Sequence, residues 1–261
     1  HPLVRQDYDL LAQCCESVAS YQLRNRATVG GNCCNASPAA DSAPALYCLE
    51  AVMEVYGPQG TRRIPVHEFF TGPRRNALQP GEFLTSIHLP PVAPRSAGAF
   101  NKLGRTKVGD ISIVSVAVWA GSWKLEAGSG QPEHPERVGD ATLRTTGHQS
   151  KDADQFVWRI TIGAAGPTPL RAPEAEAALA EDASPEGVAR AAQLAAEAAR
   201  PIDDIRASAV YRRGMVAVLT RRGVNSVLAR LDAPSTGESP SSALGRPPAQ
   251  DALTSAAGGA A

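Results

Sequence analysis

A glycine-rich stretch in the first fifth of the chain has the residue types of a phosphate-binding loop. Thr28, Gly30, Gly31 and Asn32 follow one another closely, and adjacent glycines allow positive φ values that bring the backbone close to a ligand. Successive N–H groups in such a turn form a concavity that favours anions. The side chains of Thr28 and Asn32 add donors, and Ser37 lies near enough in sequence to join them. The stretch therefore indicates a phosphate site, although a glycine pair taken alone more often forms an ordinary tight turn.

The same stretch lacks the two commonest nucleotide-binding patterns. Residues 24–46 contain no lysine, whereas a P-loop requires Gly-x-x-x-x-Gly-Lys-Ser/Thr and a Rossmann turn requires Gly-x-Gly-x-x-Gly. The predicted ligand is therefore neither ATP nor a Rossmann-bound nicotinamide. Arg24 is expected to bond carbonyl or carboxylate groups of the protein, with a phosphate contact as the alternative.

The overall composition narrows the class of protein. The 261 residues allow two modest domains, and the 26 basic and 26 acidic side chains cancel, which gives no support for a general nucleic-acid or membrane-surface binder. No run of 18 apolar residues occurs, so no membrane span is predicted. The five cysteines include adjacent pairs without C-x-x-C spacing. They predict free thiols, no metal site and a cytoplasmic location.

Periodicity and turn residues predict the secondary structure of the first part of the chain. The expected elements are an amphipathic helix over residues 6–20, an extended segment over 21–26, a short helix capped by Ser42 that ends at 50, a hairpin over 51–66 and a strand over 83–89. The proline-rich segment 90–95 marks a domain boundary.

The residues after this boundary are expected to form a second layer of strands and helices. The predicted elements are strands within 98–104, 110–120 and 156–164, helices over 171–179 and 185–199, and a long helix over 205–231 that Gly214 or Gly223 could break. Residues 121–155 predict a hairpin excursion or mobile loop. Asp204 and Arg206 are expected to form ion pairs that fix the last helix. The predicted domains are residues 1–95 and 96–231, followed by a disordered tail over 232–261.

Four passages of the sequence resemble one family. ATVGGNCCNASPAADSAPAL is similar to the T-x-G-G-N…N-x-S-P-x-x-D-x-x-P-A-L signature of FAD-binding subunits of molybdenum hydroxylases. The turn at 80–84, the segment FNKLGR…DISIVSVA and residues 201–212 match three further patterns of these subunits. The family includes the medium subunit of carbon monoxide dehydrogenase and the flavin domain of xanthine dehydrogenase, and the resemblance covers about residues 3–231.

The resemblance implies a fold and a function. The fold is α+β, with a vanillyl-alcohol-oxidase or PCMH-type FAD-binding domain followed by a smaller α+β domain of antiparallel sheet and helices. The implied function is electron transfer from [2Fe-2S] clusters of a small subunit through FAD to an acceptor such as quinone or NAD. A large subunit would hold the molybdenum cofactor, and the complex would be a dimer of heterotrimers.

The resemblance also assigns site residues. Pyrophosphate binding falls to Thr28, Val29, Gly30, Gly31 and Asn32, the phosphate or ribose side to Ser37 and Asp41, and the flavin border to Cys34, Leu84 and Lys102. No catalytic acid or base and no metal ligand is implied. From the residues alone, the favoured roles are a helix cap for Asp41, a core leucine for Leu84 and a solvated strand lysine for Lys102.

The family pattern starts before this sequence does. Relatives carry an earlier subdomain with its own glycine-rich loop on the FAD pyrophosphate, and that subdomain is apparently missing here. A truncated sequence is the expected reason, with a second chain that supplies the segment or a lost FAD site as alternatives. Two rival functions remain: a scaffold subunit that docks partners without FAD, and an independent flavin oxidoreductase of the vanillyl-alcohol-oxidase type.

Overall fold

The computed structural model describes residues 1–93, 95–106, 109–122 and 156–233. Residues 123–155 of the predicted excursion and 234–261 of the predicted tail lie outside these ranges. Among the described residues, none of the helices combines the length and the apolar character that a bilayer crossing requires.

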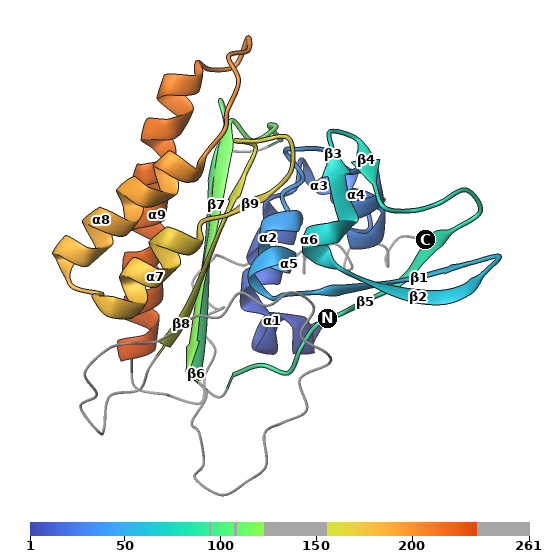
Figure 1. Ribbon diagram of the computed structural model, residues 1–261, viewed down its shortest axis with the longest axis horizontal. Helices are drawn as coiled ribbons and strands as arrows, with labels where there is room; N and C mark the ends of the chain where they lie inside the picture. Colours follow the sequence, from blue (N-terminus) through green and yellow to red (C-terminus); the bar gives the residue numbers. More distant parts are fainter. Residues whose placement is uncertain (94, 107–108, 123–155, 234–261) are drawn as a thin grey trace, which may run out of the picture.

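The N-terminal part consists of short helices followed by small sheets (Figure 1). The helices are α1 (Pro2–Asp7), α2 (Asp9–Ser17), α3 (Tyr21–Arg24), α4 (Val29–Asn35), α5 (Ala43–Cys48) and α6 (Val66–Phe69). The strands are β1 (Val52–Gly57), β2 (Gly60–Pro65), β3 (Phe70–Gly72), β4 (Arg75–Asn76) and β5 (Phe83–His88). β1, β2 and β5 form an antiparallel sheet in the order β2-β1-β5, and β3 pairs with β4. The predicted hairpin and strand are confirmed.

Two predictions for the first 26 residues need correction. The single helix over 6–20 is two helices, because Tyr8 has non-helical dihedral angles (φ −127°, ψ 49°). Its hydroxyl donates to the carbonyl of Pro90 at 2.9 Å, a tertiary bond with no local sequence signal. The expected extended segment at 21–26 is wrong, because residues 21–24 form α3.

The C-terminal part is a sheet covered on one face by three helices (Figure 1). The strands β6 (Arg95–Leu103), β7 (Val114–Ser122), β8 (Phe156–Gly163) and β9 (Leu170–Arg171) are antiparallel and pair in this order. The helices are α7 (Pro173–Glu181), α8 (Pro185–Ala198) and α9 (Ala209–Asp232). Neither glycine breaks α9. At Gly223 a Cβ would lie 2.7 Å from Cγ2 of Val118, so glycine lets α9 lie against β7.

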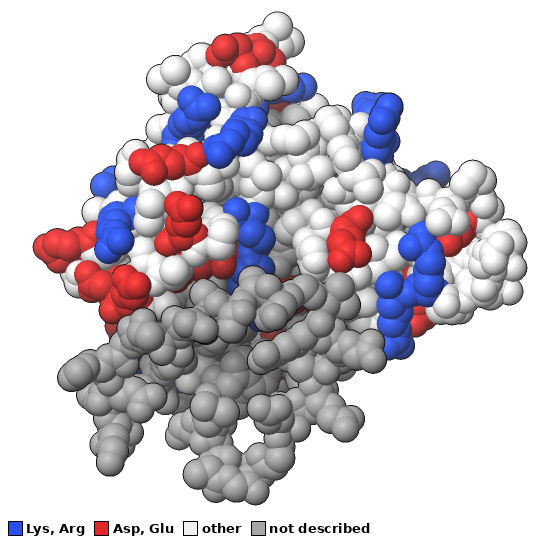
Figure 2. Space-filling model, viewed as in Figure 1, with Lys and Arg blue, Asp and Glu red and all other residues white. Residues whose placement is uncertain are grey.

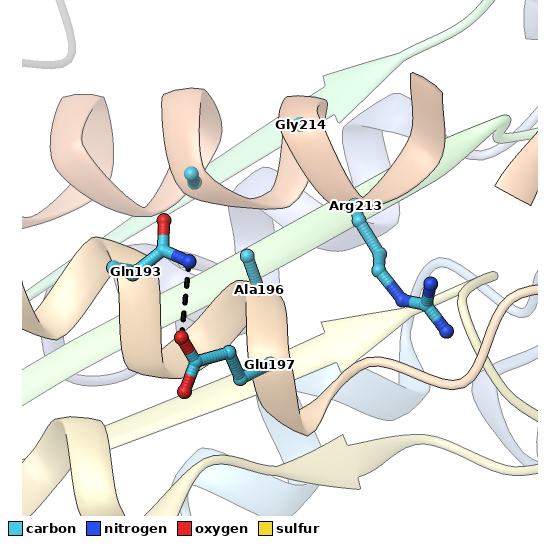
Figure 3. A pocket seen from close by; sticks show the side chains of 6 residues that line it. Gln193, Ala196, Glu197, Arg213 and Gly214 are labelled. Atoms are coloured by element: carbon cyan, nitrogen blue, oxygen red, sulfur yellow. Dashed lines mark hydrogen bonds between the residues drawn. The ribbon is translucent and has the colours of Figure 1, made fainter. Parts of the chain in front are cut away.

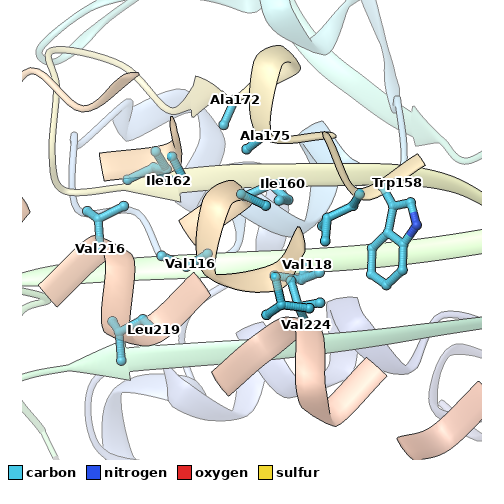
Figure 4. Close-up of a cluster of buried hydrophobic side chains, with 14 of the residues drawn as sticks. Val116, Val118, Trp158, Ile160, Ile162, Ala172, Ala175, Val216, Leu219 and Val224 are labelled. Atoms are coloured by element: carbon cyan, nitrogen blue, oxygen red, sulfur yellow. The ribbon is translucent and has the colours of Figure 1, made fainter. Parts of the chain in front are cut away.

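β7 joins the two parts of the molecule because its two faces belong to different hydrophobic clusters. Val116 and Val118 pack with Ile160 of β8 and with α7, α8 and α9, as Figure 4 shows. Ala117 and Trp119, on the opposite face, belong to the cluster formed by the N-terminal helices and strands. The N-terminal part therefore packs directly on the back of the C-terminal sheet. The domain limits 1–95 and 96–231 stay a prediction.

The turn before β5 is held by an ion pair that predicts an acid-dependent stability. Arg62 contacts Glu82 with both Nε and Nη2, at 2.8 and 2.7 Å, and the N–H of Gln79 donates to the same carboxylate. The Arg62 guanidinium and this N–H hold the pKa of Glu82 down, at about 2. A carboxyl with a lowered pKa stabilises the folded state above its unfolded pKa of about 4.3, and this contribution is lost as the pH falls toward 2.

We therefore expect the Glu82→Gln variant to be less stable at neutral pH and to lose less stability between pH 4.5 and pH 2 than the wild type. Urea unfolding at several pH values measures, for each protein, the slope of the unfolding free energy against pH. The Arg62→Gln variant is the matched control, because it removes the cation but keeps the carboxyl, and its slope should also be shallower. Equal slopes for Glu82→Gln and the wild type would contradict the assignment.

Candidate functional site

The predicted phosphate loop is the start of a helix. Thr28 is the N-cap of α4: its hydroxyl accepts from the N–H of Gly31 at 2.9 Å, and its carbonyl accepts from the N–H of Asn32 at 3.0 Å. The N–H groups of Val29 and Gly30 are left without a partner inside the helix. The positive φ values that a glycine pair allows do not occur at Gly30 and Gly31. In the described chain, the glycines with positive φ are Gly60, Gly81 and Gly109.

The two glycines have different reasons to lack a side chain. A Cβ at Gly31 would lie 2.9 Å from the Thr28 hydroxyl oxygen and would disturb the cap. A Cβ at Gly30 would lie 3.6 Å from Cδ2 of Leu84, an ordinary van der Waals distance. The structure therefore places Leu84 of β5 beside the first turn of α4, at the predicted cofactor site.

α4 is anchored to neighbouring elements through polar groups. The Asn32 side-chain oxygen accepts from the hydroxyl of Ser42 at 2.6 Å, which ties α4 to the start of α5. The carbonyl of Cys34 accepts from the side chain of Asn76 at 2.7 Å, which ties it to β4. The hydroxyl of Ser37 accepts from the N–H of Ala39 at 3.2 Å. Asn32 and Ser37 are therefore held in place, and their side-chain oxygens already accept protein hydrogen bonds.

The cysteines around α4 are neutral thiols. The predicted free state of all five cysteines is confirmed. Burial raises the pKa of Cys33 to about 12, and it also raises the pKa of the half-buried Cys34. Both side chains are therefore protonated at neutral pH, and both pack as small apolar groups in or against the N-terminal cluster.

A cavity of about 470 Å³ lies between the first two helices and the start of α4. This volume is in the range of small-molecule sites. Its polar wall includes Thr28, Asn32 and Ser42, and its apolar wall includes Leu11 and Val29. Of the ten predicted site residues, Thr28, Val29 and Asn32 line this cavity. Ser42 was expected to be only a helix cap, and nothing in the sequence indicates that it contacts Asn32.

Arg24 shapes the same cavity through the backbone. Its Nη1 donates to the carbonyls of Val18 and Ala19, at 2.8 and 2.9 Å. These two carbonyls follow the end of α2, and Ala19 has a positive φ of 43°. The structural role predicted for Arg24 is confirmed, because its guanidinium fixes the connection between α2 and α3.

Asp41 and Lys102 form a buried ion pair and are not among the residues that line the cavity. Lys102 Nζ of β6 lies 2.6 Å from Asp41 Oδ2 and 2.9 Å from the carbonyl of Ser17, and the Ser112 hydroxyl donates to Asp41 Oδ1 at 2.5 Å. The two side chains are only 15% and 7% exposed. Burial raises the pKa of Asp41, although Lys102 and Ser112 act in the opposite direction. Asp41 therefore does not cap α5 but connects α2, α5 and β6.

Comparison with known proteins identifies the class to which this fold and site belong. Residues 1–92 match the family model described as the FAD binding domain in molybdopterin dehydrogenase. Residues 142–227 match the CO dehydrogenase flavoprotein C-terminal domain. The chain belongs to the family of FAD-binding flavoprotein subunits of molybdenum hydroxylases, which confirms the resemblance and the fold class predicted from the sequence.

Individual relatives agree with this family. The carbon monoxide dehydrogenase medium chain of Afipia carboxidovorans is 31% identical over 215 residues, which cover 82% of this chain and 64% of the relative. A putative xanthine dehydrogenase FAD-binding subunit of Escherichia coli is 30% identical over 177 residues, 67% of this chain and 51% of the relative. The chain thus spans from about half to two thirds of the length of these two relatives.

Solved structures show the same fold. A carbon monoxide dehydrogenase from Hydrogenophaga pseudoflava that lacks the Mo-pyranopterin moiety superimposes with a TM-score of 0.73 at 29% identity. The match covers 88% of this chain and 70% of that chain. Quinoline 2-oxidoreductase from Pseudomonas putida gives a TM-score of 0.68 at 25% identity, over 87% of this chain and 70% of that one.

Proposed function

We propose that the chain is an FAD-binding electron-transfer subunit of a molybdenum hydroxylase complex. Residues 28–32 lie within the matched FAD-binding domain and form the start of α4. The observation that carries the proposal is that this helix start lies on the wall of a cavity. Thr28, Val29 and Asn32 line this cavity, and Gly30 lies with them in the first turn of α4. Helix N-termini favour phosphate groups, because their free N–H groups and the helix dipole both attract negative charge.

The chemistry of these residues fits one part of FAD. A diphosphate needs several N–H or O–H donors at close approach, and the first turn of α4 offers the N–H groups that have no partner inside the helix. The apolar wall with Leu11 and Val29 suits an uncharged part of the ligand. FAD supplies the ability to accept single electrons and release a pair, and the protein supplies placement and electrostatics.

The residues proposed to bind FAD are those that the family resemblance implies, and the ion pair between Asp41 and Lys102 limits what these two residues can contact. Residues 28–32 bind the pyrophosphate, Ser37 and Asp41 lie on the phosphate or ribose side, and Cys34, Leu84 and Lys102 border the flavin. Because Asp41 and Lys102 bond each other at 2.6 Å, neither can reach a ligand without the other being held nearby. Asp41 and Lys102 are therefore proposed to hold the elements around the FAD site in place. A direct contact with the cofactor would involve only those donor or acceptor positions that the ion pair does not use.

The proposal extends to the complex. Electrons would reach the FAD site from [2Fe-2S] clusters in a small subunit, after substrate oxidation at a molybdenum cofactor in a large subunit, and would leave to a quinone or NAD. The support for this route is the family to which the chain belongs and the names of its relatives, which include carbon monoxide, xanthine and nicotinate dehydrogenase subunits. A dimer of heterotrimers in the cytoplasm is the proposed assembly.

An absorption spectrum with FAD, iron and molybdenum analysis tests the proposal. The protein is purified from its native host with the chains that accompany it. We expect flavin bands close to one FAD per copy, together with iron and molybdenum. A complex without flavin would support a scaffold subunit instead, and a yellow chain without metal-containing partners would support an independent flavin oxidoreductase.

A single methyl group at Gly30 tests the placement of the cofactor. The Gly30→Ala side chain would fit against Leu84 at 3.6 Å, and alanine favours a helix, so the melting temperature should not fall. The methyl group would occupy the proposed flavin side, and we expect FAD content to fall about tenfold, as a loss of about 1.4 kcal/mol in binding would produce. Gly72→Ala is the control, because its Cβ would meet only Arg75 carbons at 3.9 Å. Unchanged FAD content in Gly30→Ala would disprove this placement.

A further inference from the structure

The arginine that fixes the connection between α2 and α3 has unused hydrogen-bond donors. Arg24 lines the cavity of about 470 Å³ together with Thr28 and Asn32. Its Nη1 is engaged, because this atom donates to the carbonyls of Val18 and Ala19, at 2.8 and 2.9 Å. Within the described part of the chain, Nε and Nη2 of Arg24 have no partner. These two nitrogens form one edge of the guanidinium plane, and such an edge binds a phosphate or carboxylate through two parallel N–H groups.

The bonds to the two carbonyls hold the guanidinium of Arg24 in one place. Val18 is the C-cap of α2, and Arg24 is the last residue of α3. A free arginine side chain carries about 2 kcal/mol of rotamer entropy, part of which is lost when it binds a ligand. Because Nη1 already restricts the side chain, the edge formed by Nε and Nη2 is preorganised for a ligand.

The side chains that line this cavity carry one positive charge that no carboxylate neutralises. With histidine counted as neutral, the charged side chains among them are Arg5, Glu16 and Arg24. Arg5 pairs with Glu16 through Nη1, so these two charges cancel. No ion pair of Arg24 occurs among the residues that the structure describes. The net charge of the cavity is therefore that of Arg24, and it favours an anionic ligand.

Another cavity of similar volume lacks this excess of charge. It measures about 480 Å³ and lies between α8 and α9, with Glu197 and Arg213 in its lining. Figure 3 shows Gln193 donating to Glu197, at 3.0 Å, and Arg213 further along α9. The two opposite charges in this lining cancel. Figure 2 shows the same mixture of basic and acidic side chains over the helical layer. Of the two cavities, the one beside Arg24 is therefore suited to an anion.

We propose that Arg24 binds a phosphate of FAD through its Nε and Nη2, while its Nη1 holds the connection between α2 and α3. The inference rests on the proposed function, because FAD is the anionic ligand that the proposed function places in this cavity. Arg24 adds a cation to polar lining residues, Thr28, Asn32 and Ser42, that are uncharged. Hydrogen bonds from arginine to phosphate are roughly twice as strong as those between neutral groups, so this cation should raise the affinity for FAD.

The experiment compares the binding of FAD with that of riboflavin, which carries the same ring system without a phosphate. Arg24→Gln removes the charge but can still donate to a carbonyl, and Arg24→Lys keeps the charge but loses the planar edge. Arg26→Gln is the matched control, because Arg26 is exposed and is not among the residues that line the cavity. Each protein is purified with the chains that accompany it, stripped of flavin and titrated with either flavin at several salt concentrations. Melting temperatures are measured on the same samples.

We expect Arg24→Gln to bind FAD about tenfold more weakly than the wild type, with an unchanged affinity for riboflavin. Arg24→Lys should lie between the two, and Arg26→Gln should behave as the wild type. The FAD affinity of the wild type should fall with salt more steeply than that of Arg24→Gln, because salt screens the interaction between arginine and phosphate.

Equal losses of FAD and riboflavin affinity in Arg24→Gln would overturn the proposal, because they would show that Arg24 acts only by shaping the cavity. An unchanged FAD affinity would overturn it as well. The wild type gives a further measurement that does not depend on the folding of a variant: the same salt dependence for FAD and riboflavin would also contradict a phosphate contact. A wild type that binds neither flavin would overturn the proposed function and this inference together.

Discussion

The Lys102→Met variant should lose about 3 kcal/mol of unfolding free energy, because it leaves the Asp41 carboxylate buried without its cation. In the wild type, Lys102 Nζ contacts Asp41 Oδ2 at 2.6 Å and the Ser17 carbonyl at 2.9 Å. Methionine fills most of the volume of the lysine side chain, but it can neither pair with the carboxylate nor donate to the carbonyl. Urea unfolding of the isolated chain at pH 7 measures this loss.

The same variant should show a characteristic pH dependence. Burial already raises the pKa of Asp41, and removal of Lys102 takes away the group that lowers it most. The folded variant then binds a proton that the unfolded chain has released, so its stability falls as the pH rises above the unfolded pKa of about 3.9. We expect the deficit relative to wild type to be smaller at pH 4.5 than at pH 7. A deficit that is the same at both pH values would contradict an unpaired Asp41.

A double variant separates the lost charge pair from lost packing. Asp41→Asn/Lys102→Met removes both charges, so it should be more stable than Lys102→Met alone. FAD content gives a second readout. If the pair positions the FAD site, Lys102→Met should bind less FAD even under conditions in which the variant is folded. The double variant should then recover unfolding free energy without recovering all of the bound FAD. Equal FAD content in all three proteins would leave the pair with a structural role only.

The sequence predicted the regular elements of the C-terminal part better than the contacts of the site. Alternation of apolar residues located β8, and the helix predicted over 185–199 is α8, which Ser184 caps because its hydroxyl accepts from the N–H of Gly187. These signals are local, because strand and cap patterns lie within a few residues. The long helix was also predicted, although it begins at Ala209 rather than near Ile205.

The contacts that the sequence did not predict are those between distant residues. Asp41 and Lys102 are 61 positions apart, and the Tyr8 hydroxyl bonds a carbonyl 82 positions away. Neither pair has a local pattern. The family signature identified Asp41 and Lys102 as important without indicating that they bond each other. The glycine pair was also misjudged, because Thr28 caps a helix at Gly31, and a helix start needs no positive φ.

The Arg212→Met variant should destabilise the C-terminal part by about 3 kcal/mol, because Arg212 is a buried charge that connects three segments. Its Nη1 donates to the carbonyls of Ile113 and Ala164, at 2.8 and 3.0 Å, and its Nη2 lies 2.6 Å from Asp204 Oδ1. Burial raises the pKa of Asp204, but the neighbouring N–H groups and Arg212 lower it to about 2 overall. The variant therefore leaves two buried carbonyls and a carboxylate without this donor.

The neighbouring arginine provides the control for this prediction. Arg213→Met changes an exposed side chain on the same helical turn, and its effect on the stability of the isolated chain should be within about 0.5 kcal/mol. Arg212→Lys keeps the charge but loses the planar fork, so its stability should lie between the wild type and Arg212→Met. Equal urea midpoints for Arg212→Met and Arg213→Met would contradict this role. Through these bonds Arg212 fixes the start of α9 to the residue just before β7 and to the residue just after β8.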